Sequence, residues 1–145
     1  MENRDCILLN AIYKNVRMAT WAIDNISPAI ENEALKELVK KQNSIYEQIT
    51  HKCQNYAKKQ HISLKDISFC LKSMSWMGIK CGTLFNKKTI HIAEKLIRGT
   101  TMGITDIIMK TSESNSENEE LRNLSNDLKR NEEVFVEGLK EFLMR

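Results

Sequence analysis

Three side chains in the second half of the chain have the type and spacing to bind a metal ion. His91 and Glu94 are three residues apart, so on a helix they share one face. Glu132 interrupts a row of apolar residues further along the chain. A carboxylate placed among apolar side chains needs a partner, which can be a cation, a metal ion or a hydrogen-bond donor. His91, Glu94 and Glu132 are therefore the candidate metal ligands of this sequence.

A dinuclear iron site in a four-helix bundle takes a Glu from each of two helices and a Glu-x-x-His pair from each of the other two. The nearest match in the first half of the chain is Gln48-Ile-Thr-His51, in which Gln replaces Glu and His51 is expected to face solvent. The later pair is in the reverse order, and Phe135 stands where a His would follow Glu132. The sequence thus favours degenerate ligands and no cofactor, with one weakly bound ion as the alternative.

An interpretation without metal assigns the same three residues to an internal polar network. His91, Glu94 and Glu132 would then hydrogen-bond to one another or to neighbouring polar side chains, because a buried charge must be paired. The neighbours available for this are Lys88, Arg98, Thr100 and Thr101. In this interpretation the three side chains stabilise the fold and neither bind a metal ion nor take part in a reaction.

The elements that position these residues follow from apolar residues at alternating gaps of three and four, the period of a helix. The expected helical segments are 3–26, 28–60, 64–86, 89–111 and 116–144. Ser27 and Pro28 are expected to start the second segment and Ser63 to cap the third. The inward residues of the first segment are Leu9, Ile12, Val16, Ala19, Ile23 and Ile26. Those of the second are Leu35, Leu38, Gln42, Ile45, Ile49, Cys53 and Tyr56, with Gln42 and Cys53 as its weak points.

The remaining stripes complete a bundle. The inward residues of segment 89–111 are Ile92, Leu96, Gly99, Gly103 and Ile107. Those of the last segment are Leu121, Leu124, Leu128, Glu132, Phe135, Leu139 and Phe142. With 145 residues, 5 Gly and 1 Pro, the chain is expected to be one all-α domain over 1–145. The predicted architecture is an antiparallel four-helix bundle with an extra or kinked helical segment at 64–86.

A resemblance supports this fold. The segment from Thr89 to Asp106, TIHIAEKLIRGTTMGITD, resembles a group of small helical proteins from anaerobic Gram-positive bacteria, with His-Ile-Ala-Glu followed by Gly-Thr-Thr-Met-Gly. Asn131-Glu132 and the run from Leu139 to Leu143 lie in the corresponding places of the last helix. The group resembles the ferritin-like four-helix bundles. The resemblance implies that fold, and it implies little about activity.

The cysteines and the apolar runs indicate where the protein works. Cys6, Cys53, Cys70 and Cys81 form no Cys-x-x-Cys pair, so they are expected to be free thiols in a reducing compartment. The first residues carry no secretory-type apolar run, and no stretch is long enough to span a membrane. We therefore expect a cytoplasmic protein.

Charge is spread unevenly along the chain. Residues 61–111 carry eight basic and three acidic side chains, a net of +5, and residues 112–145 carry five basic and nine acidic, a net of −4. These segments can complement each other within a bundle. Nucleic acid is not an expected partner, because its recognition calls for a basic patch on one element.

The segment from Ile67 to Phe85 is rich in Met, Trp and Cys and has few charges, which indicates packing on the bundle, contact with a second copy or a membrane surface. Gly99 and Gly103 favour close approach of another helix. The expected function is a non-enzymatic interaction or scaffold protein that self-associates or binds a protein partner. The alternatives are a ferritin-type metal-binding stress protein and a membrane-surface or coat-associated protein.

Overall fold

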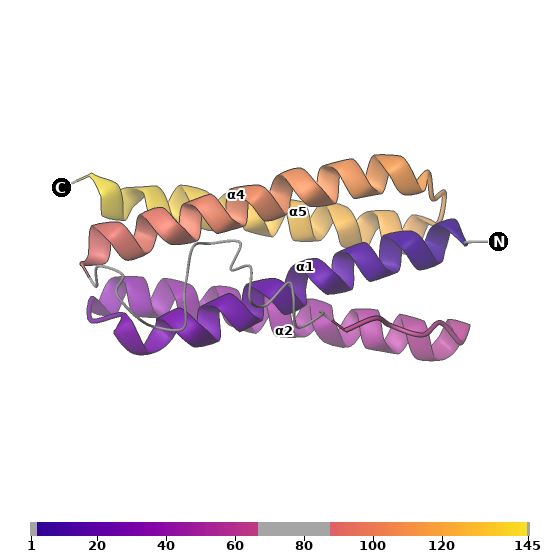
Figure 1. Ribbon diagram of the computed structural model, residues 1–145, viewed down its shortest axis with the longest axis horizontal. Helices are drawn as coiled ribbons and strands as arrows, with labels where there is room; N and C mark the ends of the chain where they lie inside the picture. The colour runs from indigo at the N-terminus through magenta and orange to yellow at the C-terminus, as the bar shows by residue number, and fades with distance from the viewer. Residues whose placement is uncertain (1–2, 67–87, 145) are drawn as a thin grey trace.

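The chain folds into long α-helices that lie along one common axis. The computed structural model describes residues 3–66 and 88–144. Within these ranges the ordered elements are four α-helices and two short 3-10 turns, with no strand. They are α1 (Arg4–Ile26), η1 (Ser27–Ala29), α2 (Glu33–Gln60), α4 (Thr89–Ser114), α5 (Glu119–Lys140) and η2 (Glu141–Leu143) (Figure 1). The expected all-α fold is confirmed for this part of the chain.

Each helix has two principal neighbours. Helix α1 packs against α2 and α4, and α5 packs against α4 and α2, so the order around the bundle is α1, α2, α5, α4. Figure 1 shows α4 lying beside α5 and α1 beside α2 over most of their length. Side chains from all four helices that lie at the same height along the bundle axis can therefore meet in its centre.

The core confirms most of the inward residues that the sequence predicts. The predicted inward residues that are only half-buried are Leu38, Ile45, Gly103 and Phe142. All six inward residues expected for α1 are buried, and so are Leu35, Ile49, Cys53 and Tyr56 of α2. The α5 stripe from Leu121 to Leu139 is buried throughout, including Glu132. Helical periodicity identifies these residues because only one face of each helix can be withdrawn from water in a bundle.

Asparagines define three of the helix starts. The side chains of Asn3, Asn32 and Asn118 accept hydrogen bonds from backbone N–H groups in the first turns of α1, α2 and α5. His61 and Asn115 adopt the left-handed conformation at the ends of α2 and α4, which lets the chain leave each helix. These local signals fix where the buried stripes begin and end.

The structure corrects several helix limits. Ser27 and Pro28 start only the short turn η1, and Ile30 is extended before α2 begins at Glu33. The second helix is therefore shorter than the expected 28–60. Helix α4 runs to Ser114 and not to residue 111, and the last helix is Glu119–Lys140 with η2 after it, in place of 116–144.

The third expected segment, 64–86, is described only at its start. Residues 62–66 form no helix, so Ser63 does not act there as the expected cap, and residues 67–86 lie outside the described residues. The backbone N–H of Lys65 donates to Asn10 Oδ1 over 2.8 Å, and Arg17 Nε lies 3.6 Å from Asp66 Oδ1. The chain after α2 is thereby held along the outside of α1.

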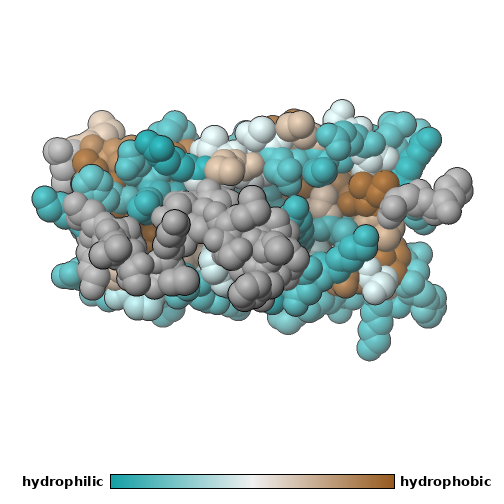
Figure 2. Space-filling view, in the orientation of Figure 1, coloured by the Kyte–Doolittle hydropathy of each residue, from teal (hydrophilic) through white to brown (hydrophobic). Residues whose placement is uncertain are grey.

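The surface that the structure describes is mainly hydrophilic. Figure 2 shows teal side chains over most of the visible face and brown, hydrophobic patches that are separate from one another. Within residues 3–66 and 88–144 no helix combines the length and the apolar character that crossing a membrane requires.

Candidate functional site

The most unusual residue of the interior is Glu132 on α5. Its exposed fraction is 1%, although it is an acid and stands in the middle of an apolar stripe. Oε2 accepts a hydrogen bond of 2.9 Å from the hydroxyl of Tyr46 on α2. Among the residues that the structure describes, the donor to this carboxyl is thus a phenol and not Lys88 or Arg98, which the sequence offered as cations.

Tyr46 is itself fully enclosed, with 1% of its surface exposed. Burial and the nearby carboxyl of Glu132 hold the pKa of the Tyr46 phenol well above its usual range, while the side chain of Gln42 acts in the opposite direction. Gln42 precedes Tyr46 by one helical turn, so both project from the same face of α2. The phenol therefore keeps its proton near neutral pH and acts as the donor to Glu132.

Two further helices meet the same carboxyl. Asn15 Nδ2 on α1 donates to the backbone oxygen of Gly103 on α4 over 3.0 Å. A Cβ atom added to Gly103 would lie 3.3 Å from Asn15 Nδ2 and 3.3 Å from Glu132 Oε2. Glycine at this position thus lets the backbone of α4 lie close to both groups, which is the close approach expected at Gly103.

The environment determines the charge of Glu132. Burial raises the pKa of Glu132 to about 8 from its usual 4.5, and hydrogen bonds from Tyr46 and Asn15 limit the rise. Desolvation therefore dominates over hydrogen bonding. At neutral pH the side chain is mainly protonated, which explains how it is buried without a basic partner.

Not every polar atom of this cluster is satisfied. Asn15 Oδ1, Gln42 Nε2 and Glu132 Oε1 are buried and have no hydrogen-bond partner. Buried polar atoms without partners are uncommon in folded proteins, because each costs about 1–3 kcal/mol. We call Asn15, Gln42, Tyr46, Gly103 and Glu132 the central polar cluster; it draws on all four helices and holds unused hydrogen-bonding capacity.

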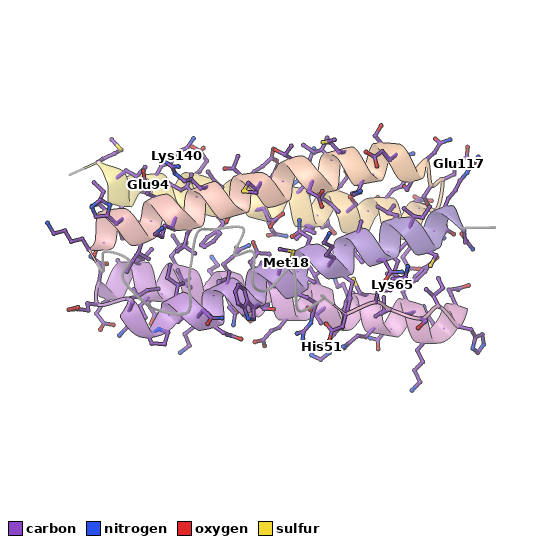
Figure 3. All side chains as sticks on the ribbon, in the orientation of Figure 1. Met18, His51, Lys65, Glu94, Glu117 and Lys140 are labelled. Carbon is purple, nitrogen blue, oxygen red and sulfur yellow. The ribbon has the colours of Figure 1, made fainter. Side chains whose placement is uncertain are left out.

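A groove of about 430 Å³ leads from the surface to this cluster. It runs between α1 and α4, and both Asn15 and Gly103 lie on its floor. Its lining residues are Lys14, Asn15, Met18, Thr101, Met102, Gly103, Thr105, Asp106 and Met109. Figure 3 labels Met18, which projects from α1 on the side that faces α4. The groove is therefore mainly apolar, with one basic and one acidic side chain.

The structure does not bring the three candidate metal ligands together. His91 and Glu94 are exposed in the first turns of α4, and Glu94 Oε2 lies 3.2 Å from Arg98 Nη2. Glu94 precedes Gly103, the residue that contacts Glu132, by nine positions, which is about 13 Å along a helix. Figure 3 shows Glu94 on the outer side of α4. Within the described ranges no group of three or more His, Cys, Asp and Glu could hold a metal ion.

The other residues singled out by chemistry are also apart from the central polar cluster. Gln48 and His51 are exposed on α2, as expected for His51. Cys6 and Cys53 are free thiols, as expected, and burial raises the pKa of the Cys53 thiol to about 12. Cys70 and Cys81 lie outside the described residues. None of the described members of this group is placed to act with Glu132.

Sequence reasoning found Glu132 and Gln42 but missed Tyr46 and Asn15. Gln42 and Glu132 were visible because each interrupts an apolar stripe. Tyr46 follows the predicted inward residue Ile45, and Asn15 precedes the predicted inward residue Val16. Periodicity therefore did not include either of them in the buried face. The available signal was a buried carboxyl without a basic neighbour, which requires donors from the facing helices.

In the part of the chain that the structure describes, four α-helices surround a buried, protonated carboxyl, and an apolar groove lies beside it. Comparisons of the chain with protein-family models, with curated proteins and with solved structures found no match. Proposals about function therefore depend on the geometry just described.

Proposed function

We propose that the protein is a non-enzymatic interaction protein of the cytoplasm, built as an antiparallel, ferritin-like bundle, and that two copies associate through the outer face of α4. The interior supports the non-enzymatic part of this proposal, because Tyr46 and Asn15 occupy the positions around Glu132 that ligands of a dinuclear site would need. The surface of α4 supports the rest.

Exposed apolar side chains concentrate on one helix, and this observation carries the proposal. The described part of the chain exposes six large hydrophobic side chains, of which four are on α4. These four are Ile90, Met102, Ile108 and Met109, with exposed fractions of 38–54%. Removing such side chains from water stabilises an interface by about 25 cal/mol for each Å² buried. An apolar surface shared by two copies is the simplest use of them.

The charges on α4 suit a second copy of the same chain. Arg98, Met102 and Asp106 follow one another at intervals of four residues and so lie along one ridge of the helix. A two-fold axis through Met102 would place Arg98 of each copy opposite Asp106 of the other, as an interface between identical surfaces requires. Exposed ion pairs add little affinity, but they fix orientation.

Light scattering coupled to size exclusion tests the proposal over a range of protein concentrations. We expect a dimer for the wild-type chain and a monomer for Ile108→Glu, which places a charge in the apolar face. Val134→Glu is the matched control, because Val134 is 66% exposed on α5 and lies away from that face. A wild-type protein that stays monomeric at the highest concentrations, or an Ile108→Glu variant that remains dimeric, would refute the proposal.

The buried acid favours one further candidate, a ferritin-type metal-binding protein, since Glu132 stands where a bundle holds metal ligands. Elemental analysis of protein purified without chelators distinguishes the two functions. Stoichiometric iron, manganese or zinc that is lost in Glu94→Ala or Glu132→Gln would establish the metal-binding function. Metal content at background in all three proteins is the result expected from the interaction protein.

A further inference from the structure

We propose that the groove between α1 and α4 binds an amphiphilic primary amine, whose ammonium group is held by Glu132 and whose apolar chain lies along the methionines. The groove overlaps the face proposed for self-association, because Met102, Met109 and Asp106 contribute to both, so the amine is expected to bind the monomer. It assigns a ligand class to the central polar cluster.

The first observation is a buried carboxyl oxygen without a hydrogen-bond partner. Glu132 Oε2 is used by Tyr46, whereas Glu132 Oε1 is buried and unpartnered. No basic side chain of the described residues forms an ion pair with this carboxyl. A primary ammonium group carries three N–H donors and a positive charge on one small atom. When the ammonium group binds, Glu132 releases its proton to solvent, and the ammonium group supplies a donor to Oε1 and the charge that compensates the ionised carboxylate.

The second observation is access from the groove. Glu132 Oε1 and Oε2 lie 3.7 Å and 3.3 Å from the point where a Cβ of Gly103 would be, and Gly103 is part of the groove floor. Because glycine has no side chain, only its backbone and the side chain of Asn15 separate groove and carboxyl at this point. Asn15 is held by hydrogen bonds to the backbone oxygen of Gly103 and to Glu132. In the proposed complex the Asn15 side chain turns aside, and the ammonium group takes its place beside Glu132.

The groove walls suit an apolar chain attached to that head group. Met18 on α1 faces Met102 and Met109 on α4, and methionine side chains adapt to ligands of differing shape. The volume of about 430 Å³ lies within the range of about 300–1,000 Å³ typical of small-molecule sites. Asp106 in the lining attracts a cation on its way in, and Lys14 opposes it. These features favour an alkylammonium ion over a hydrated inorganic cation.

Size and shape exclude bulkier cations. The passage over Gly103 is narrow, since a single added Cβ would already be 3.3 Å from two polar atoms. A guanidinium group is planar and wider than an ammonium group, and it carries its donors in a fixed fork. A quaternary ammonium ion has no N–H to give to Glu132 Oε1. The site should therefore prefer primary amines to both.

Calorimetry on the full chain tests the proposal with n-hexylammonium chloride as the probe. We expect saturable binding to the wild-type protein, and an affinity at least tenfold lower for 1-hexanol, which keeps the chain but lacks the charge. Glu132→Gln, which keeps the shape but cannot ionise when the ammonium group binds, should also lower the hexylammonium affinity at least tenfold. Glu133→Gln is the matched control, because Glu133 is its exposed neighbour on α5 and should leave the affinity unchanged.

Gly103→Ala provides a second variant that keeps the carboxyl and narrows the passage, and it too should weaken binding at least tenfold. Circular dichroism establishes that each variant is folded. Ile108 does not line the groove, so Ile108→Glu, which is expected to be a monomer, should bind the amine at least as tightly as the wild type does. Failure of self-association and failure of amine binding are therefore separate results. Absence of binding, equal affinity for hexanol, or unchanged affinity in both folded variants would overturn the inference.

Discussion

Tyr46 and Glu132 join α2 to α5 through a hydrogen bond of 2.9 Å between two fully buried side chains. The donor is a phenol whose pKa is raised, and the acceptor is a carboxyl whose pKa is raised to about 8. Both groups therefore stay neutral near pH 7, and the pair needs no basic partner. A neutral pair of this kind links two helices without the desolvation cost of a buried ion pair.

Removing the donor of this pair should destabilise the bundle. Tyr46→Phe leaves the ring in place and deprives Glu132 Oε2 of its hydrogen bond. We expect the free energy of unfolding to fall by about 1–3 kcal/mol, because a buried acceptor is left without a partner. Urea unfolding followed by circular dichroism measures it. Tyr13→Phe is the control, since Tyr13 is buried but donates no hydrogen bond within the described residues, and an equal loss in both variants would contradict the prediction.

The stability of the protein should depend on the protonation of Glu132. Its pKa is about 8 in the folded protein against 4.5 for an ordinary glutamate. Between these values the folded chain holds a proton that the unfolded chain has released, so raising the pH favours unfolding. This contribution is complete at or below pH 4.5 and is lost as the pH rises to about 8. Its slope approaches about 1.4 kcal/mol per pH unit within the window.

Comparison with a variant isolates this contribution from all other titrations. Glu132→Gln has no titratable group at the position, so its free energy of unfolding should decline less between about pH 5 and pH 8 than that of the wild type. Denaturant unfolding at several pH values gives both curves. Glu133→Gln should follow the wild type. Parallel curves for wild type and Glu132→Gln would show that Glu132 is already ionised in the folded protein.

Substitution by alanine should change the stability of the protein in opposite directions at the two glycines that lie at helix contacts, Gly103 and Gly138. A Cβ at Gly103 would press on Asn15 and Glu132, which are buried and hydrogen-bonded, whereas a Cβ at Gly138 would meet only the methyl groups of Leu38, 3.2 Å away. Leu38 is half-buried and can rotate. We expect Gly138→Ala to gain part of the helix preference of alanine, up to about 1 kcal/mol. Gly103→Ala should lose stability despite the same preference, and thermal unfolding of both variants checks the contrast.

The sequence predicts the helices well and their ends less well, for a physical reason. The buried stripes of α1 and α5 follow from the period of 3.6 residues, which many residues determine together. A helix end depends on one or two residues, and between residues 27 and 33 more than one residue can start a helix. Pro28 suits the first turn of a helix, but here it belongs to η1, and Asn32 caps α2 instead. The alternative start could not be excluded without knowing how Ile30 packs.

The site was predictable only where polarity interrupts an apolar stripe. Glu132 and Gln42 stood out for that reason, whereas His91 and Glu94 shared a helix face that the structure directs to solvent. The contact of Asn15 with Gly103 joins residues 88 positions apart, and that of Tyr46 with Glu132 joins residues 86 apart. Such contacts depend on the rotation of each helix about its axis and on the register between helices, and local periodicity predicts neither.

One end of the bundle offers a last test, because Asn118 has two roles there. Its Oδ1 accepts from the backbone N–H of Leu121 at the start of α5, and its Nδ2 donates to the hydroxyl of Tyr56 on α2 over 2.9 Å. Asn32 caps α2 in the same way through Leu35, and its side chain makes no such second contact with another described residue. Loss of a cap alone costs about 1 kcal/mol.

Asn32→Ala should therefore lower the free energy of unfolding by about 1 kcal/mol, and Asn118→Ala by roughly 2 kcal/mol, since it also leaves the Tyr56 hydroxyl without its donor. Urea unfolding of the two variants gives the difference. Tyr56→Phe in the Asn118→Ala background should cause little further loss, because the two changes remove the same hydrogen bond. Equal losses for Asn32→Ala and Asn118→Ala would mean that the contact between α2 and α5 at this end contributes nothing beyond the cap.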